Sequence, residues 1–262
     1  MPLNIRTYHD LSEPDRSGLL DQVVEQRRRV AARMGTVRGV VAVMSGKGGV
    51  GKSFVTAHLA RALQRAGRPA GVLDADLNGP TAARLLETEG GAGALAIRGD
   101  AVVPPTGADG VRVLSMAHLL EDGRPLAFRG PDADRFVWRG AMEAAALREF
   151  LSDVAWGTLD RLLVDLPPGL ARFEELADLL PAPPAVLTVT IPTPESADAV
   201  RRALRAAVDR GATALGVVEN MVGGHFRGSA GESLAAEFGV PLLARVPFDP
   251  PAAVWAALAA RV

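Results

Sequence analysis

The sequence contains no cysteine and only two lysines. The absence of cysteine excludes disulfides, thiolate metal ligands and thiol nucleophiles from within this chain. No apolar run reaches the roughly 18 residues that a membrane-spanning helix needs, and the first residues lack the basic and then apolar order of a secretory signal. We therefore expect a cytoplasmic protein whose chemistry uses no thiol.

Charges of the two signs nearly cancel, which leaves a formal net charge of -1 at pH 7. This balance gives no electrostatic reason to expect binding to nucleic acid or to an anionic membrane. The hydrophobic fraction of 48% and the length of 262 residues are sufficient for one large core. We therefore expect a globular protein that contacts neither nucleic acid nor membrane.

Short apolar runs alternate with helical patterns along most of the chain. The runs are rich in valine and leucine, as in strands buried on both faces of a parallel sheet, and they cover residues 40–44, 70–73, 111–114, 162–164, 185–189, 214–218 and 241–246. Helical patterns cover residues 53–66, 141–152, 196–210 and 229–238. This alternation predicts a doubly wound α/β fold of three layers, with a mostly parallel sheet and helices on both faces.

The chain divides into a predicted N-terminal helical extension, residues 1–37, and one domain, residues 38–262. Apolar residues at helical spacing, among them Leu19, Val23 and Val30, indicate an amphipathic helix that leads into the domain. The last residues, AAVWAALAARV, are apolar with one arginine and indicate a helix that faces the core. Residues 88–110 and 119–140 interrupt the alternation, and the sequence assigns no role to the second segment.

A glycine-rich loop at residues 46–53 carries the clearest chemistry. Its sequence, GKGGVGKS, fits G-x-x-x-x-G-K-[ST] and lies between a predicted strand and a predicted helix, which is the context that a phosphate-binding P-loop requires. Glycines let the backbone N–H groups face an anion, and the helix N-terminus adds its positive dipole end. The predicted nucleotide-binding residues here are Gly46, Lys47, Gly48, Gly49, Val50, Gly51, Lys52, Ser53 and Phe54.

Both lysines of the chain stand in this loop, whereas the other 27 of the 29 basic residues are arginine. Lys52 is expected to reach the β- and γ-phosphates of a nucleotide, and the Ser53 hydroxyl is expected to bind Mg²⁺. A lysine suits this position because its ammonium is compact, whereas the wide guanidinium of arginine does not fit inside the phosphate nest. The generic P-loop has no requirement that explains Lys47.

Carboxylates end two further predicted strands. Asp74 and Asp76 belong to the run LDAD, and Asp165 ends the run LLVD. Ligands of open α/β sheets bind outside the carboxyl ends of the strands, where these residues and the P-loop would meet. We therefore expect a carboxylate of the first run to face the water beside the γ-phosphate, and Asp165 to hold Mg²⁺ through a water.

The loop KGGVGKS resembles the deviant Walker A motif of the MinD/ParA ATPases. The resemblance implies that Lys47 reaches across an ATP-sandwiching homodimer to the phosphates held by the other subunit, where it offsets charge much as an arginine finger does. It also implies that Asp76 orients the attacking water and that Asp74 supports the metal site indirectly. Lys47, Lys52 and Asp76 are thus the expected catalytic residues, with ATP and Mg²⁺ as cofactors.

Within that group the chain looks most like the Mrp-type ATP-binding proteins, which are associated with iron–sulfur cluster assembly. The residues that carry this resemblance span about 38 to 250 and include Asp-Leu-Pro-Pro-Gly at 165–169 and Val-Glu-Asn-Met at 218–221. The resemblance implies that Asn220 and the turn of Pro247, Phe248 and Asp249 surround the adenine. The Asn220 amide suits the edge of an adenine because the amide offers both a hydrogen-bond donor and an acceptor.

The chain departs from the Mrp pattern at three places. Mrp-type carriers usually have a Cys-x-x-Cys pair soon after Glu-Asn-Met, but residues 222–228 read VGGHFRG. Cluster ligation needs thiolates or occasionally histidine, and His225 would give a dimer at most two ligands, so we expect no iron–sulfur cluster on this chain alone. Phe54 replaces the usual second hydroxyl residue, and residues 169–171 replace a polar segment, so slow hydrolysis is expected.

Three functional hypotheses remain open. The first is an Mrp-like ATPase that dimerises around Mg-ATP and engages an unidentified protein partner, in metal-centre maturation. The second is a ParA- or MinD-like positioning or regulatory ATPase, for which the only candidate basic stripe is Arg201, Arg202, Arg205 and Arg210 on one predicted helix. The third is a nucleotide-binding subunit with little turnover that works with a cysteine-bearing homologue.

Overall fold

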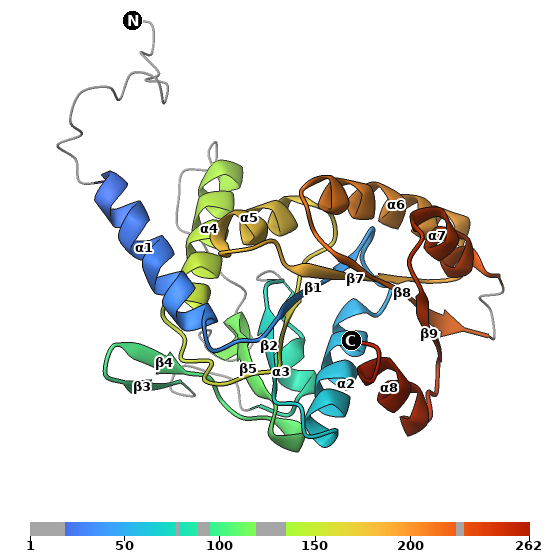
Figure 1. The fold of residues 1–262 in the computed structure, drawn as a ribbon, viewed down its shortest axis with the longest axis horizontal. Coiled ribbons are helices and arrows are strands. Elements are labelled where there is room, and N and C mark those ends of the chain that lie inside the picture. The colour runs from blue at the N-terminus through green and yellow to red at the C-terminus, as the bar shows by residue number, and fades with distance from the viewer. Residues whose placement is uncertain (1–18, 77–78, 89–94, 119–134, 224–227) are drawn as a thin grey trace, which may run out of the picture.

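The structure, a computed structural model, describes residues 19–76, 79–88, 95–118, 135–223 and 228–262. A seven-stranded sheet forms the middle layer, in the order β5-β2-β6-β1-β7-β8-β9 (Figure 1), and every pairing within it is parallel. The seven predicted runs form its strands, which are β1 (Val40–Ser45), β2 (Ala70–Asp74), β5 (Arg112–Ser115), β6 (Arg161–Asp165), β7 (Ala185–Thr190), β8 (Ala214–Val222) and β9 (Leu242–Pro247).

Helices cover both faces of this sheet (Figure 1). One face carries α2 (Lys52–Arg65), α3 (Ala82–Leu85) and α8 (Ala252–Ala259), and the other carries α4 (Arg135–Ser152), α5 (Ala171–Leu179), α6 (Pro194–Asp209) and α7 (Ala230–Phe238). Along β1, Val41 and Val43 belong to the core on the α2 face, whereas Ala42 and Met44 belong to the core on the opposite face. The inner strands are mostly apolar because both of their faces are buried. Helices on both faces of a parallel sheet confirm the three-layer α/β prediction.

Helix α1 (Leu19–Met34) forms the predicted N-terminal helix and packs against α4. Its Val30 and Met34 are buried in the same core cluster as Leu147 and Leu151 of α4. Val37 then makes an isolated parallel bridge with Leu159 before β1 begins. The helix therefore covers part of the core, while the division of the chain at residue 37 stays a prediction.

The two segments that interrupt the alternation differ from each other. Residues 88–110 contain an antiparallel hairpin of β3 (Ala96–Arg98) and β4 (Ala101–Val103), and then a 3-10 turn, η2 (Ala108–Gly110). The second segment is described only from Arg135, where α4 begins, and residues 119–134 lie outside the described residues. Helix α4 thus starts six residues before the predicted residue 141.

The C-terminal helix α8 faces the core, as its composition predicted. Trp255 is 6% exposed and Leu258 is fully buried, and the helix packs against α2. Within the described ranges, no helix is both long and apolar enough to cross a membrane.

Truncation of a buried residue on α1 tests whether this helix stabilises the fold. Val30 is 1% exposed, whereas Val24 on the same helix is 66% exposed. We expect Val30→Ala to lower the free energy of unfolding by about 2 kcal/mol, and the matched control Val24→Ala to change it by less than about 0.5 kcal/mol. Urea denaturation measures both. Equal small effects would show that α1 adds little to the core.

Candidate functional site

Three neighbouring strands bring the P-loop and the carboxylates together. In the sheet, β1 pairs with β6 and β6 pairs with β2, and the register places Asp165 beside both Val43 and Asp74. Paired residues of neighbouring parallel strands point to the same face of the sheet, so Asp74 and Asp165 lie next to each other on the α2 face. Both are fully buried. The structure therefore assembles one site from strand ends that are far apart in the sequence.

The P-loop connects β1 to α2 and depends on two of its glycines. A Cβ atom at Gly46 would lie 2.2 Å from the backbone carbonyl carbon of Ala199 on α6, and one at Gly51 would lie 2.2 Å from Nδ2 of Asn220. Gly51 also has a φ of 79°, in the left-handed region that favours glycine. Only glycine therefore fits at these two positions of the loop.

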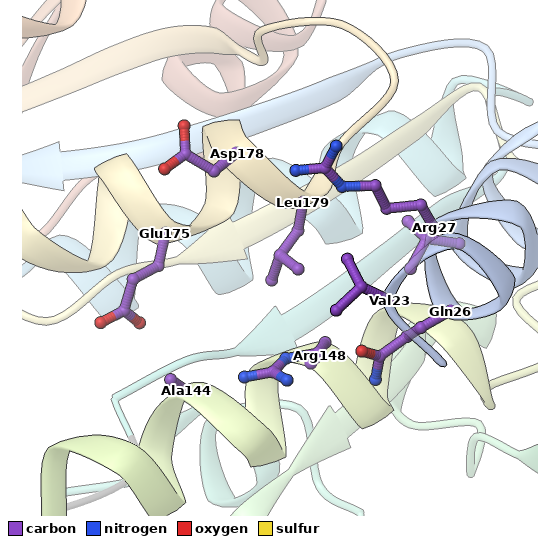
Figure 2. A pocket seen from close by; sticks show the side chains of 9 residues that line it. Val23, Gln26, Arg27, Ala144, Arg148, Glu175, Asp178 and Leu179 are labelled. Atoms are coloured by element: carbon purple, nitrogen blue, oxygen red, sulfur yellow. The ribbon is translucent and has the colours of Figure 1, made fainter. Parts of the chain in front are cut away.

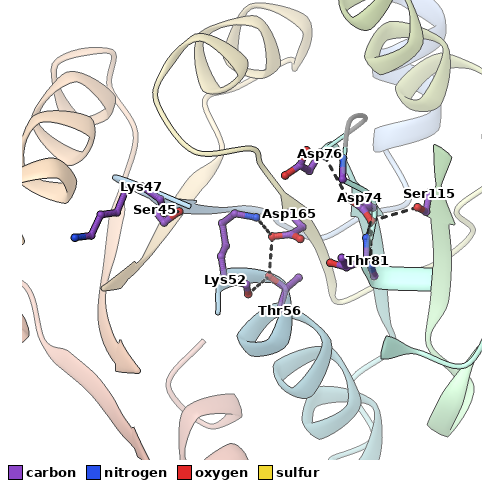
Figure 3. Close-up of polar contacts among 11 residues, drawn as sticks. Ser45, Lys47, Lys52, Thr56, Asp74, Asp76, Thr81, Ser115 and Asp165 are labelled. Carbon is purple, nitrogen blue, oxygen red and sulfur yellow. Dashed lines mark hydrogen bonds and ion pairs between the residues drawn. The ribbon is translucent and has the colours of Figure 1, made fainter. Parts of the chain in front are cut away.

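Lys52 is buried with its ammonium against Asp165. Nζ of Lys52 donates to Oδ1 of Asp165, and the side chains are 7% and 0% exposed (Figure 3). The hydroxyl of Thr56, one helical turn after Lys52, donates to the same oxygen at 3.3 Å. Oδ2 of Asp165 is buried and has no hydrogen-bond partner among the described residues. A spare buried carboxylate oxygen beside the P-loop suits a magnesium ion held through a water.

Asp74 is a buried carboxyl group of the site with a raised pKa. Burial, and then the neighbouring charge of Asp165, raises the pKa of Asp74 from 3.8 to about 7. Hydrogen bonds from the backbone N–H groups of Ala82 and Asp76, and the charge of Lys52, act in the other direction. Four donors hold the carboxylate of Asp74 in place. Its Oδ2 accepts from the backbone N–H groups of Thr81 and Ala82, each at 2.9 Å, and from the Ser115 hydroxyl at 3.2 Å, and its Oδ1 accepts from the N–H of Asp76 at 3.2 Å. Asp74 thus ties the start of α3 to the sheet.

A cavity of about 290 Å³ opens over the P-loop. It is lined by Ser45, by residues 47–54, and by Asp76, Thr81, Arg84, Leu85 and Pro168. In Figure 3 the Lys47 side chain points away from the ion pair of Lys52 and Asp165. The cavity therefore joins the predicted residues Lys47, Lys52, Ser53, Phe54 and Asp76, while Lys47 directs its charge elsewhere.

The predicted adenine residues lie outside this cavity. Asn220 is 2% exposed, and its Nδ2 donates to the carbonyl oxygen of Val50 at 2.9 Å. Pro247 ends β9, the strand that pairs with β8 and so with Asn220, and Phe248 in the turn that follows is 61% exposed. Asn220 thus adjoins the P-loop, and the adenine-binding role of Asn220, Pro247, Phe248 and Asp249 stays a prediction. Residues 77–78 and His225 lie outside the described residues.

Phe54 enters an aromatic cluster that links the P-loop helix to the C-terminal helix. Its ring centroid lies 4.3 Å from that of His58 and 5.7 Å from that of Trp255, and His58 stacks on Trp255 at 4.8 Å with an interplanar angle of 16°. The position that usually carries a second hydroxyl therefore packs α2 against α8.

Comparison with known families adds an independent observation. A family described as ParA: NUBPL iron-transfer P-loop NTPase matches residues 36–257. The chain belongs to this family. The match covers the whole sheet, the P-loop and the helices that flank them, so this P-loop NTPase shares the site-bearing part of its fold with the family.

Similar proteins carry names that refer to iron–sulfur clusters. The chain is 37% identical over 234 residues to an iron-sulfur cluster carrier protein of Saccharolobus solfataricus, covering 85% of this chain and 75% of that protein. It is 40% identical over 229 residues to the human cytosolic Fe-S cluster assembly factor NUBP2, covering 82% and 80%. These relatives place this NTPase among the Mrp-type proteins of the MinD/ParA group, as its motifs indicated.

Two solved structures support the same fold. The nucleotide-binding protein from Archaeoglobus fulgidus, in complex with ADP, is similar with a TM-score of 0.68 and 29% identity over 89% of this chain and 91% of that one. The septum site-determining protein MinD from Pyrococcus horikoshii, complexed with Mg-ADP, has a TM-score of 0.59 and 21% identity over 85% and 94%. The MinD likeness concerns the fold alone.

Sequence reasoning missed three residues of this NTPase site. Thr56 follows Lys52 by four residues, a helical spacing that could have revealed it. Ser115 ends β5, beside β2, and only the strand order shows that it meets Asp74. Arg84 reaches the cavity from α3, a four-residue helix with no periodic signal of its own.

The pKa of Asp74 predicts how stability depends on pH. The folded protein binds the proton of the Asp74 carboxyl group more tightly than the unfolded chain does. Protonation of Asp74 therefore stabilises the fold fully below about pH 4, and this stabilisation is lost as the pH rises through about 7. Asp74→Asn cannot titrate. We therefore expect the free energy of unfolding of the unaltered protein, relative to this variant, to fall by up to about 4 kcal/mol over that range.

Urea denaturation without nucleotide at several pH values measures this difference. The control Asp100→Asn changes a carboxylate that is 89% exposed, so its stability curve should stay parallel to that of the unaltered protein. A parallel curve for Asp74→Asn would contradict the raised pKa.

The aromatic cluster predicts the effect of restoring a hydroxyl residue after Ser53. Phe54→Thr removes one ring of the cluster, and we expect it to lower the free energy of unfolding by about 2 kcal/mol and to change the fluorescence of Trp255. Phe54→Leu keeps an apolar side chain and should lose less stability. If the threonine variant is as stable as the unaltered protein, the cluster does not hold α2 against α8.

Proposed function

We propose that this protein is a dimeric switch that binds Mg-ATP, hydrolyses it slowly and serves iron–sulfur cluster assembly without ligating a cluster itself. The observation that carries the proposal is the cavity over the P-loop. There the P-loop and the buried Lys52 line a cavity at the carboxyl edge of the sheet. Lys52 pairs with Asp165, and Oδ2 of Asp165 has no hydrogen-bond partner among the described residues. This arrangement suits a nucleoside triphosphate with its metal.

The residues of the cavity have distinct proposed roles. The loop N–H groups and Lys52 bind the β- and γ-phosphates, the Ser53 hydroxyl binds Mg²⁺, and Asp165 holds the ion through a water. When bound, Mg²⁺ neutralises charge on the phosphate oxygens. Asp76 lines the same cavity and orients the water that attacks the γ-phosphate, so that ADP and phosphate are released.

Lys47 acts in the other subunit of the proposed dimer. Lys47 lines the cavity, but its side chain points away from the ion pair of Lys52 and Asp165 in its own subunit (Figure 3). This direction supports a contact in trans. Asn220 and the turn at residues 247–249 are proposed to hold the adenine, with Oδ1 of Asn220 as the acceptor while its Nδ2 holds the P-loop.

The link to iron–sulfur clusters rests on the named relatives. A chain without cysteine has no thiolate to bind a cluster. We therefore propose that a client, or a cysteine-bearing homologue that assembles with this chain, supplies the ligands. The relative named as a cytosolic factor supports the expected cytoplasmic location.

The alternative of a DNA-bound positioning ATPase is less well supported. Of the four arginines in the candidate stripe, Arg201 pairs with Asp198 and Glu237, Arg205 pairs with Glu237, and Arg210 pairs with Glu174 and Asp178. These acids neutralise most of the stripe, which then offers little attraction to DNA phosphates.

Substitution of Lys47 tests the proposed dimer. We expect Lys47→Ala to leave the Kd for a non-hydrolysable ATP analogue within about threefold, because Lys47 does not hold its own subunit's phosphates. The variant should no longer dimerise when the analogue is added. Its rate of phosphate release should fall at least tenfold, as it does when the charge of an arginine finger is lost. Mass measurement with and without the analogue, and a phosphate assay, give both readouts.

Two controls separate the possible failures. Lys52→Ala should abolish nucleotide binding altogether, because it removes the cation of the P-loop. If Lys47→Ala leaves both dimerisation and turnover unchanged, the mechanism in trans is wrong.

Anaerobic isolation with metal analysis tests the assembly role, since copurification with an iron-bearing partner is the expected result.

A further inference from the structure

Arg84 is a cation of the P-loop cavity that the family motifs do not explain. It lies on α3, lines the cavity together with Lys52 and Asp76, and is exposed. Within the part of the chain that the structure describes, its guanidinium makes no hydrogen bond or ion pair, whereas other arginines such as Arg61 and Arg68 pair with carboxylates. An exposed arginine beside a phosphate-binding loop, with no partner among the described residues, is available to a bound anion.

The position of Arg84 is set by the buried carboxylate of Asp74. Two backbone N–H groups at the start of α3, those of Thr81 and Ala82, donate to Asp74, and Ala82 and Ala83 are buried against the core. Asp74 in turn lies beside Asp165 in the sheet register. The short helix is thus held on the same strand ends that hold Lys52, which fixes the backbone of Arg84 relative to the P-loop.

The charges of the cavity leave a place for a second cation. The charge of Lys52 is shared with Asp165, Lys47 points away (Figure 3), and Asp76 adds a negative charge of its own. A terminal phosphate carries more charge than one lysine offsets. Arginine presents several N–H groups in a planar fork that matches two oxygens of one phosphate.

We propose that Arg84 binds the terminal phosphate of a nucleoside triphosphate held by its own subunit, and so distinguishes the triphosphate from the diphosphate. This assignment rests on the proposed function of the site. It makes Arg84 a specificity residue of the switch, since the contact exists only while the terminal phosphate is attached. Asp74 is its positioning residue.

Isothermal titration calorimetry with Mg²⁺ tests the assignment, using ADP and a non-hydrolysable ATP analogue. We expect Arg84→Ala to weaken binding of the analogue about tenfold or more, as loss of a hydrogen bond between charged groups does, and to leave the Kd for ADP within about twofold. Arg84→Lys should recover part of the preference. The control Arg98→Ala, an exposed arginine on β3, should change neither Kd.

The outcomes separate this assignment from the proposed function. One outcome is that the unaltered protein binds both nucleotides while Arg84→Ala weakens the binding of both equally, or of neither. In that case Arg84 does not bind the terminal phosphate, although the nucleotide site itself is supported. If the unaltered protein binds neither nucleotide, the proposed function is wrong and the assignment is wrong with it. Thermal denaturation of each variant shows whether the fold is intact.

A pocket of about 240 Å³ between α1, α4 and α5 is the next strongest candidate (Figure 2). Its lining combines the charged residues Arg27, Arg148, Glu175 and Asp178 with apolar residues such as Val30 and Leu179. Nothing among the described residues shows what would occupy it, and we assign it no ligand.

Discussion

The buried ion pair between Lys52 and Asp165 is the interaction on which the rest of the site depends. Removing two charges from water costs several kcal/mol for each ion, so neither can stay buried and charged without a partner of opposite sign. The P-loop glycines place Lys52 at the start of α2, and the pairing of β1 with β6 brings Asp165 beneath it. When a nucleotide and its metal are bound, a phosphate would take the place of Asp165 as the partner of Lys52. Mg²⁺ would take the place of Lys52 as the partner of Asp165, so that neither buried charge is left uncompensated.

Asp74 connects that ion pair to α3, which lies at the edge of the cavity. It lies beside Asp165, so its pKa responds to the charge there, and it holds the start of α3 by two backbone hydrogen bonds. A change of charge at Asp165, such as the arrival of a metal ion, therefore acts on a group that positions α3 and Arg84. This connection gives a physical basis for the proposed switch between nucleotide states.

Much of the fold could be predicted from local patterns. The seven apolar runs form the seven strands because buried parallel strands need apolar side chains on both faces. The loop at 46–53 was recognisable because its glycines let the backbone N–H groups face a phosphate. The hairpin of β3 and β4 was not predicted, since its strands have three residues each and show no alternation long enough to read. The start of α4 at Arg135 was not predicted either, because the apolar residues Phe136, Val137 and Trp138 are consecutive and a glycine follows at position 140, so they show no helical spacing.

The sequence by itself determined the kind of site: a phosphate-binding loop with a second lysine, two carboxylate strand ends, and no cysteine for a cluster. Tertiary structure alone decided how these parts meet. The strand order places β6 between β1 and β2, so that the charge of Asp165 raises the pKa of Asp74. Packing of α8 on α2 brings Trp255 against Phe54, although about 200 residues of chain separate them. Such contacts depend on strand order and on the faces that helices bury, and neither is encoded in the residues next to the motif.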